Sequence, residues 1–553
     1  MKVRIIIFLL ITVCCVLGCC LLLDDDPKAI ILGFIISIIT SVIGNYISKI
    51  LFTDDNTKLI KQNNKKIKEL KKECSKKTSQ KEKELYIQSI RECQENNSKQ
   101  YFDRGLERFR KKPPSLNAAM KDFNKAIELK SDFAEAYFYR GLVFAIKNLN
   151  EDALKDFNKA IELNPKYIDA YRKRGELNNS MGYYEEAKKD SALASFYEGN
   201  SKYDLGKYEE AIKDYDKAIQ MGPGLGAAYY YRGEAKYKLG YYNEAIMDYN
   251  QAILLFPDVA IAYLQRGRAK HKLGYYDEAI MDYDQAIQLD PDNAEAYFHR
   301  GYTKYKLGYF DEAIKDYDQA ILLNPDLAEA YHNRGYSKYQ LGYFDEAIKD
   351  YNQAILLKPD YAEAYNNRGI VKFDREDYDE AIKDYNQAIL LKPDYAEAYM
   401  NRGVLKSTLG NNHEAIKDYD QAIQLKPDLA AAYMNRGVSK SKLGNDYEAI
   451  NDYDQAIQLD LDLAEAYINR GISKSTLGNN LEAIMDYTQA IELYPNFIKT
   501  YTYRAQCYRL LAENESNPTK KKELIDLAIK DEQKAELLQQ HKQEEDHSNS
   551  MSK

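Results

Sequence analysis

The stretch EAIKDYNQAILLKPDYAEAY occurs twice in this chain, identically, at residues 346–365 and 380–399. The copies are 34 residues apart, and the same pattern recurs at that period from Tyr101 onward. The clearest units begin at Ala294, Ala328, Ala362 and Ala396. Such a period predicts stacked supersecondary units, in place of the three or four separate domains that 553 residues would ordinarily suggest.

Fixed columns within each unit explain the period. Numbered from those alanines, small residues stand at positions 8, 20 and 27, tyrosine at 4, aromatic residues at 17 and 24, and proline at 32. Small residues let two antiparallel helices approach closely, and aromatic rings fill the space around them. Leu-Gly at 14 and 15 is typical of a helix end, and proline at 32 ends the second helix.

These columns resemble the tetratricopeptide repeat family, and the resemblance covers roughly residues 98–540. It implies an all-α fold, an α-solenoid built as a superhelix of about 13 helix pairs. The unit from Ile168 spans only residues 168–191, which predicts a kink or a fused helix near 191–197. The last unit, from Ile498, has Ala505 in the glycine column and Glu532 in the aromatic column, which predicts a capping repeat. Residues 541–553 are predicted to be a disordered polar tail.

Two apolar segments precede the repeats, at residues 5–23 and 29–48, and the acidic turn DDDPK separates them. Both are long enough to cross a bilayer, so residues 1–52 are predicted to be a transmembrane helical hairpin. Lys2 and Arg4 before it, and eleven lysines between 58 and 83, place both flanks and the repeats in the cytoplasm. Residues 53–97 are predicted to be a lysine-rich helical stalk.

A competing interpretation starts from Val16-Leu17-Gly18-Cys19, which loosely resembles a bacterial lipoprotein box. Lipidation of Cys19 would place the repeats outside the cell, and the sequence does not decide whether it occurs. The chain would then be an exported lipoprotein or a component of secretion or assembly.

Composition and motifs argue against several functions. With 78 basic and 86 acidic residues the net charge is −8, which disfavours nucleic acid as a partner. No phosphate loop, nucleophile elbow or zinc-ligand spacing occurs, and the carboxylates recur with the repeat. We therefore expect no catalytic residue, no metal site and no cofactor.

Arginine at position 7 and aspartate at position 23 depart from a purely apolar repeat core. A half-buried arginine needs a carboxylate, so we predict a structural ladder of Arg–Asp pairs between the two helices. The arginines are Arg232, Arg266, Arg300, Arg334, Arg368, Arg402, Arg436 and Arg470. The aspartates are Asp248, Asp282, Asp316, Asp350, Asp384, Asp418, Asp452 and Asp486.

Position 6 of the first helix carries the candidate peptide-binding residues. They are Asn333, Asn367, Asn401, Asn435 and Asn469. An asparagine amide both donates and accepts, so this column could pair with successive peptide units of an extended chain. It looks like the asparagine ladder of the tetratricopeptide superhelix in O-linked N-acetylglucosamine transferases. The alternative is that asparagine is simply tolerated at an exposed position of duplicated repeats.

Position 12 changes along the chain from aromatic residues to serine. The aromatic members considered for binding are Tyr237, His271, Tyr305, Tyr339 and Phe373. They could line a pocket or could serve as packing between helices. Glutamates at position 2 would favour basic peptides; they are Glu295, Glu329, Glu363, Glu397 and Glu465.

The sequence thus predicts a membrane-anchored interaction scaffold. Its partners would be other proteins, bound through extended peptide segments on the concave face of the superhelix. A self-associating, mainly architectural superhelix is a further alternative.

Overall fold

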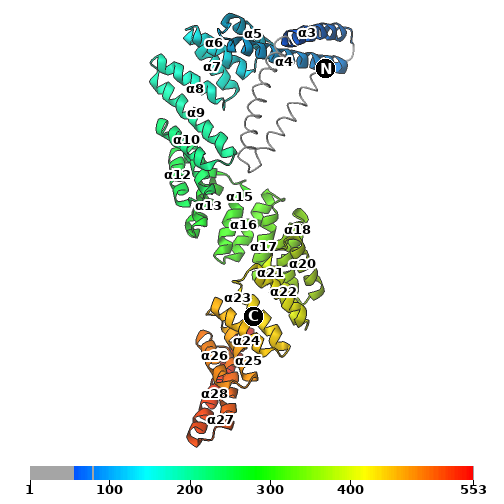
Figure 1. The fold of residues 1–553 in the computed structure, drawn as a ribbon, viewed down its shortest axis with the longest axis vertical. Helices are drawn as coiled ribbons and strands as arrows, with labels where there is room; N and C mark the ends of the chain where they lie inside the picture. Colours follow the sequence, from blue (N-terminus) through cyan, green and yellow to red (C-terminus); the bar gives the residue numbers. More distant parts are fainter. Residues whose placement is uncertain (1–54, 78–79, 552–553) are drawn as a thin grey trace, which may run out of the picture. The chain divides into compact units, whose positions relative to one another are not determined.

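A computed structural model describes residues 55–77 and 80–551, and these residues form 26 helices and no strand (Figure 1). They divide into two compact units, with the boundary between Ala269 and Lys270 inside helix α13. The predicted all-α solenoid is confirmed for the described residues. The predicted transmembrane segments 5–23 and 29–48 lie outside them. Among the described helices, none combines the length and apolar character that crossing a bilayer requires.

The first unit begins with two long helices and continues as helix pairs. Its helices are α3 (Asp55–Cys74), α4 (Gln80–Arg110), α5 (Leu116–Leu129), α6 (Ala134–Ile146), α7 (Asn150–Leu163), α8 (Ile168–Ser180), α9 (Tyr184–Asp204), α10 (Tyr208–Met221), α11 (Gly226–Lys238), α12 (Tyr242–Leu255) and the start of α13 (Ala260–Lys272).

The second unit consists of helix pairs as far as the long final helix. Its helices after α13 are α14 (Tyr276–Leu289), α15 (Ala294–Lys306), α16 (Phe310–Leu323), α17 (Ala328–Gln340), α18 (Phe344–Leu357), α19 (Ala362–Asp374), α20 (Tyr378–Leu391), α21 (Ala396–Thr408), α22 (Asn412–Leu425), α23 (Ala430–Lys442), α24 (Asp446–Leu459), α25 (Ala464–Thr476), α26 (Asn480–Leu493), α27 (Ile498–Asn514) and α28 (Pro518–Met551).

Each helix pair closes around a glycine and an aromatic ring, as the columns predict. A Cβ atom added to Gly369 on α19 would lie 2.8 Å from the ring of Tyr385 on α20, so only glycine fits there. Tyr385 is almost completely buried. The turn between the helices needs a left-handed residue, supplied in most repeats by glycine, such as Gly342 at φ +80°. In the α19–α20 turn Glu376 adopts this conformation, at φ +64°.

Contacts between repeats show which helices line the inner side of each stack. In the second unit, α15 contacts α17, α17 contacts α19, and this continues to α25 and α27. No pair of second helices from neighbouring repeats makes such a contact among the described residues. The first helices therefore lie closer together, and their exposed face is the concave one.

The short unit at 168–191 produces a fused helix, as predicted. Helix α9 runs unbroken for 21 residues and packs against both α8 and α10. Its first half carries Asp190, which accepts hydrogen bonds from Arg174 of α8. Its second half serves as the first helix of the next pair. With the interhelix turn deleted, no glycine or proline separates the two roles between Tyr184 and Glu198.

The lysine-rich segment is helical but is not an isolated stalk. Helix α4 continues from this segment into the first repeat, and α3 folds back along it (Figure 1). Asn97 Nδ2 on α4 donates to Asn64 Oδ1 on α3 at 3.0 Å, and Ile60 and Cys93 are buried. The predicted helical character of this segment is confirmed, and α3 packs on α4 around these few apolar side chains.

The polar tail also differs from its prediction. Residues 541–553 were expected to be disordered, whereas α28 continues as helix to Met551. The segment HKQEED at 541–546 contains no glycine or proline and several good helix formers. Nothing in it ends the helix that begins at Pro518.

Candidate functional site

The repeated arginine at position 7 is the most highly connected side chain of each repeat. In the repeat from Ala396, Arg402 donates to Asp418 through Nε at 2.9 Å and through a terminal nitrogen at 2.7 Å. Its other terminal nitrogen donates to Asn386 of the preceding repeat at 2.7 Å. The guanidinium also lies over the ring of Tyr399, 5.4 Å from its centroid. One side chain therefore joins two helices and two repeats.

This arrangement recurs and confirms the predicted ladder. Ion pairs of this kind are Arg232–Asp248, Arg300–Asp316, Arg334–Asp350, Arg368–Asp384, Arg402–Asp418, Arg436–Asp452 and Arg470–Asp486. Burial alone would lower the pKa of Arg436, but its bonds to Asp452 and Asp420 keep that pKa above the ordinary value. The donors of these arginines are used within the fold, so the ladder is structural.

The asparagine column divides into a closed part and an open part, although all five side chains are half-buried on first helices. In the closed part, Asn367 Nδ2 donates to His332 Nε2 at 3.0 Å, and His332 Nδ1 lies 3.2 Å from Asn333 Oδ1. Asn401 Nδ2 donates to Asn366 Oδ1 at 3.0 Å. These bonds connect α17, α19 and α21, and they occupy groups that a peptide would need.

His332 holds this closed part together through its neutral form. Burial lowers the pKa of His332 below its ordinary value. A neutral ring with its proton on Nδ1 can donate to Asn333 Oδ1 and accept from Asn367 at Nε2. Protonation would turn Nε2 into a donor and break the second bond.

In the open part, Asn435 on α23 and Asn469 on α25 form no side-chain hydrogen bond with the described residues. At position 5 of the preceding repeat, where His332 and Asn366 accept in the closed part, they have Met400 and Met434, which do not offer a nitrogen or oxygen acceptor. Both amides are only partly covered. They keep a donor and an acceptor available on the concave face.

The aromatic residues at position 12 pack against the second helix of their own repeat. Their ring partners stand at position 17, and the centroid distances are 5.3 Å for Tyr237–Tyr242, 5.2 Å for His271–Tyr276, 6.1 Å for Tyr305–Phe310, 5.9 Å for Tyr339–Phe344 and 5.7 Å for Phe373–Tyr378. Of the two interpretations that the sequence left open, this geometry favours packing, although each ring is only half-buried.

Further along, positions 12 and 17 become polar together. Hydroxyl groups donate to side-chain oxygens of the second helix, at 3.1 Å for Ser407–Asn412, 2.8 Å for Ser441–Asp446 and 3.0 Å for Ser475–Asn480. Positions 12 and 17 change from aromatic to polar residues in the same repeats. This parallel change in the sequence indicates that the two positions are in contact.

The glutamates at position 2 are partly neutralised by lysines at position 31 of the same repeat. The pairs are Glu329–Lys358 at 3.5 Å, Glu363–Lys392 at 2.9 Å and Glu397–Lys426 at 2.9 Å. Burial alone would raise the pKa of Glu363, but the bond from Lys392 holds that pKa below its usual value. Repeats starting at Ala294 and Ala464 have Asn324 and Tyr494 in place of the lysine. A preference for basic peptides would therefore be confined to repeats whose glutamate has no lysine partner at position 31.

Family models match much of the chain. A model described as TPR repeat matches residues 199–240, 233–274, 267–308, 301–342, 335–374, 371–410 and 408–444. Models described as tetratricopeptide repeat match residues 134–167, 430–463 and 464–497. The chain belongs to the tetratricopeptide repeat family. A search of curated proteins found no match.

Several solved structures are similar to this chain. MamA is 30% identical, over 30% of this chain and 96% of its own length, with a TM-score of 0.28. YrrB, described as a TPR protein with an unusual peptide-binding site, is 23% identical over 33% of this chain and 95% of its own, with a TM-score of 0.29. Yeast Tom70 is 18% identical over 78% and 99%, with a TM-score of 0.38.

In this tetratricopeptide stack, the first helices that carry the open asparagines also carry aliphatic residues one turn further on. Position 9 of the same first helices carries Val438 and Ile472, both half-buried. Positions 6 and 9 are three residues apart and so lie on one helix face. The concave face of α23 and α25 therefore combines free amides with apolar side chains, a combination suited to a peptide backbone and its side chains.

Proposed function

We propose that this protein is an interaction scaffold that binds extended peptide segments of partner proteins on the first-helix face of α21, α23 and α25. The single observation that supports it is the pair of amides, Asn435 and Asn469, that make no bond within the described residues. A peptide unit presents one donor and one acceptor, which one asparagine amide can satisfy together. Asn333, Asn367 and Asn401 would contribute only when their internal bonds open.

The test is binding of unmodified and backbone N-methylated peptides from a random peptide array. Asn435→Ala with Asn469→Ala should weaken binding of the unmodified peptides about tenfold or more, because up to four hydrogen bonds of about 0.5–1.5 kcal/mol each are lost. N-methylation, which removes backbone donors, should have a similar effect on the parent protein.

The matched control is Asn243→Ala with Asn451→Ala, two exposed asparagines on the second helices α12 and α24. This control should bind as the parent protein does. Equal binding by the parent protein and the Asn435/Asn469 variant, with folding unchanged, would contradict the proposed peptide-binding site.

We also propose that segments 5–23 and 29–48 anchor the scaffold in a membrane with its repeats in the cytoplasm. The support is their length, the acidic turn between them and the lysines that flank them. Cys507 is unsuitable as a topology probe because it is buried. A cysteine placed at the exposed Asn451 should resist an impermeant thiol reagent in intact cells. Labelling there would favour the exported lipoprotein instead.

A further inference from the structure

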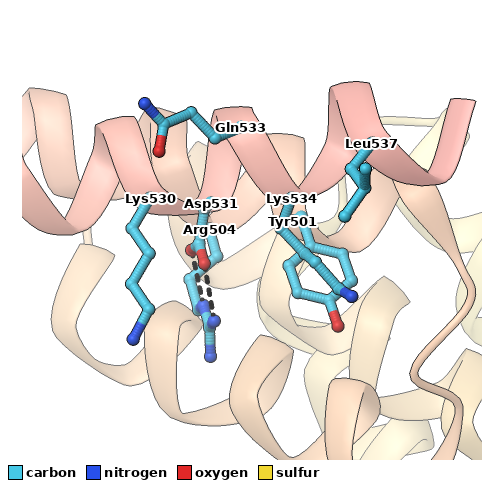
Figure 2. Close-up of a pocket in the computed structure, with 7 residues that line it drawn as sticks. All are labelled: Tyr501, Arg504, Lys530, Asp531, Gln533, Lys534 and Leu537. Atoms are coloured by element: carbon cyan, nitrogen blue, oxygen red, sulfur yellow. Dashed lines mark hydrogen bonds and ion pairs between the residues drawn. The ribbon is translucent and has the colours of Figure 1, made fainter. Parts of the chain in front are cut away.

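The C-terminal pair of helices carries a pocket on a different surface from the asparagine column (Figure 2). Its volume is about 420 Å³. Tyr501 and Arg504 of α27 form one wall, and α28 contributes Lys530, Gln533 and Lys534. We call this the C-terminal pocket.

The repeat pattern shows what occupies the corresponding place inside the stack. There, the side chain at position 25 accepts a hydrogen bond from the arginine of the next repeat. Asp420 accepts from Arg436 at 2.6 Å, and Asp454 accepts from Arg470 at 2.6 Å. An internal second helix thus offers a carboxylate or amide oxygen to a cation.

Gln533 is the equivalent of those acceptors on α28. The register follows from Arg504, which donates to Asp531 at 2.8 Å through two nitrogens, as position 7 does to position 23 elsewhere. Gln533 is two residues further on and exposed. Among the described helices α28 contacts only α27, so no arginine of a following repeat reaches Gln533.

The charge around this position is more positive than in the internal repeats, because Gln533 stands in place of an aspartate and Lys534 in place of a glutamine, whereas Lys530 corresponds to a lysine such as Lys417. Lys530 and Lys534 are four residues apart, so they lie on one face of α28, and both line the pocket. Neither forms an ion pair with another described residue. Internal repeats carry the neutral Gln421 or Gln455 where Lys534 stands. Asp531 is already engaged by Arg504, as the dashed lines in Figure 2 show.

An apolar surface adjoins these two ammonium groups. The ring of Tyr501 and the side chain of Leu537, which is 45% exposed, lie toward one end of the pocket in Figure 2. A ligand that fits must therefore carry a negative charge next to an apolar group.

We propose that the C-terminal pocket binds an acidic peptide segment of a partner protein, with a glutamate or aspartate carboxylate between Lys530 and Lys534. An adjacent apolar side chain of that segment packs on Tyr501 and Leu537. The site is independent of the concave-face asparagines, so each can be lost without the other.

The test uses the full chain in detergent and a fluorescein-labelled peptide made of three Glu-Glu-Leu repeats, with binding followed by fluorescence anisotropy. Lys530→Glu with Lys534→Glu should raise Kd at least tenfold. A peptide with glutamine in place of glutamate should not bind measurably. Because the contact is between charges, binding of the acidic peptide should weaken as salt is added.

The matched control is Lys521→Glu with Lys522→Glu, which makes the same charge change at exposed lysines near the start of α28, outside the pocket. It should change Kd less than twofold. Equal weakening by both pairs would mean that only net charge matters and would overturn the proposal, as would failure of the parent protein to bind. Unchanged binding by Asn435→Ala with Asn469→Ala would show that the two sites are separate.

Discussion

The repeats from α15 to α20 and those from α21 to α26 share one backbone plan but differ on their inner surfaces. In the first group, aromatic rings join positions 12 and 17, as in Tyr339 and Phe344. In the second group, a hydrogen bond from Ser441 to Asp446 connects the same two positions. The asparagine amides are hydrogen-bonded on α19 of the first group and on α21 at the start of the second, and they are free of such bonds within the described residues on α23 and α25. Stacking therefore fixes the backbone, while a few inner positions decide whether a surface is closed or available.

The largest expected effect tests what the two groups have in common. Arg368→Leu and Arg402→Leu should each lower the free energy of unfolding by about 3 kcal/mol, because each leaves a buried aspartate short of its main partner. Asp384 and Asp418 are 3% and 5% exposed. The measurement is urea unfolding of the purified protein.

Replacing both partners in one repeat, Arg368→Leu with Asp384→Leu, should recover only part of that loss: the buried carboxylate is removed, but Lys372, which pairs with Asp384 at 2.8 Å, loses that partner. Unchanged stability of both single variants would mean that the ladder is dispensable. A loss in only one of the two groups would break the assumption of a shared backbone plan.

A smaller effect, confined to acidic pH, should separate the closed group from the open one. Because burial depresses the folded-state pKa of His332, the unfolded chain takes up a proton that the folded chain does not. The stability it contributes is present above the unfolded pKa of about 6.5 and falls as the pH drops below it. His271, whose pKa is lowered to about 4 by burial and by Lys272 and Lys306, acts in the same direction.

His332→Asn should therefore reduce the loss of stability between pH 7.5 and 5.5, measured by urea unfolding at each pH. Asparagine already stands at this position of the next repeat, as Asn366. Hydrogen exchange, corrected for the intrinsic exchange rate at each pH, should show lower protection of α17 and α19 at pH 5.5 than at pH 7.5 in the parent protein and little change in protection of α23. The same pH dependence in the variant would exclude His332 as the responsible group.

The smallest effect concerns a turn in the closed group. Glu376→Gly should raise the free energy of unfolding by about 0.5–1 kcal/mol, because a non-glycine residue is strained at φ +64°. Gly342→Ala, in the preceding repeat at φ +80°, is the matched control and should destabilise. Thermal unfolding followed by circular dichroism measures both, and shifts in the same direction would contradict the strain argument.

The sequence predicted the Arg–Asp ladder because both residues recur at fixed positions within one repeat. It did not predict that Arg402 also reaches Asn386, because that bond depends on how closely one repeat packs on the preceding one. The bond between His332 and Asn367 was missed for the same reason, since the two residues are 35 apart and on neighbouring first helices. The sequence predicted the helices of the lysine-rich segment but not the packing of α3 on α4, which depends on tertiary contacts.

The residue types at fixed positions of the 34-residue repeat determined the helices, their pairing and the fused helix α9. Glycine, proline and small residues have this effect because they end helices or allow close helix packing within one or two turns of their own position. Tertiary packing alone decided which asparagine amides are hydrogen-bonded within the fold, which aromatic rings pack between the two helices of a repeat, and where a pocket forms beside α28. Those outcomes depend on side chains from adjacent repeats meeting at hydrogen-bond distance, and identical columns give different results when one neighbour, such as His332 or Met434, changes.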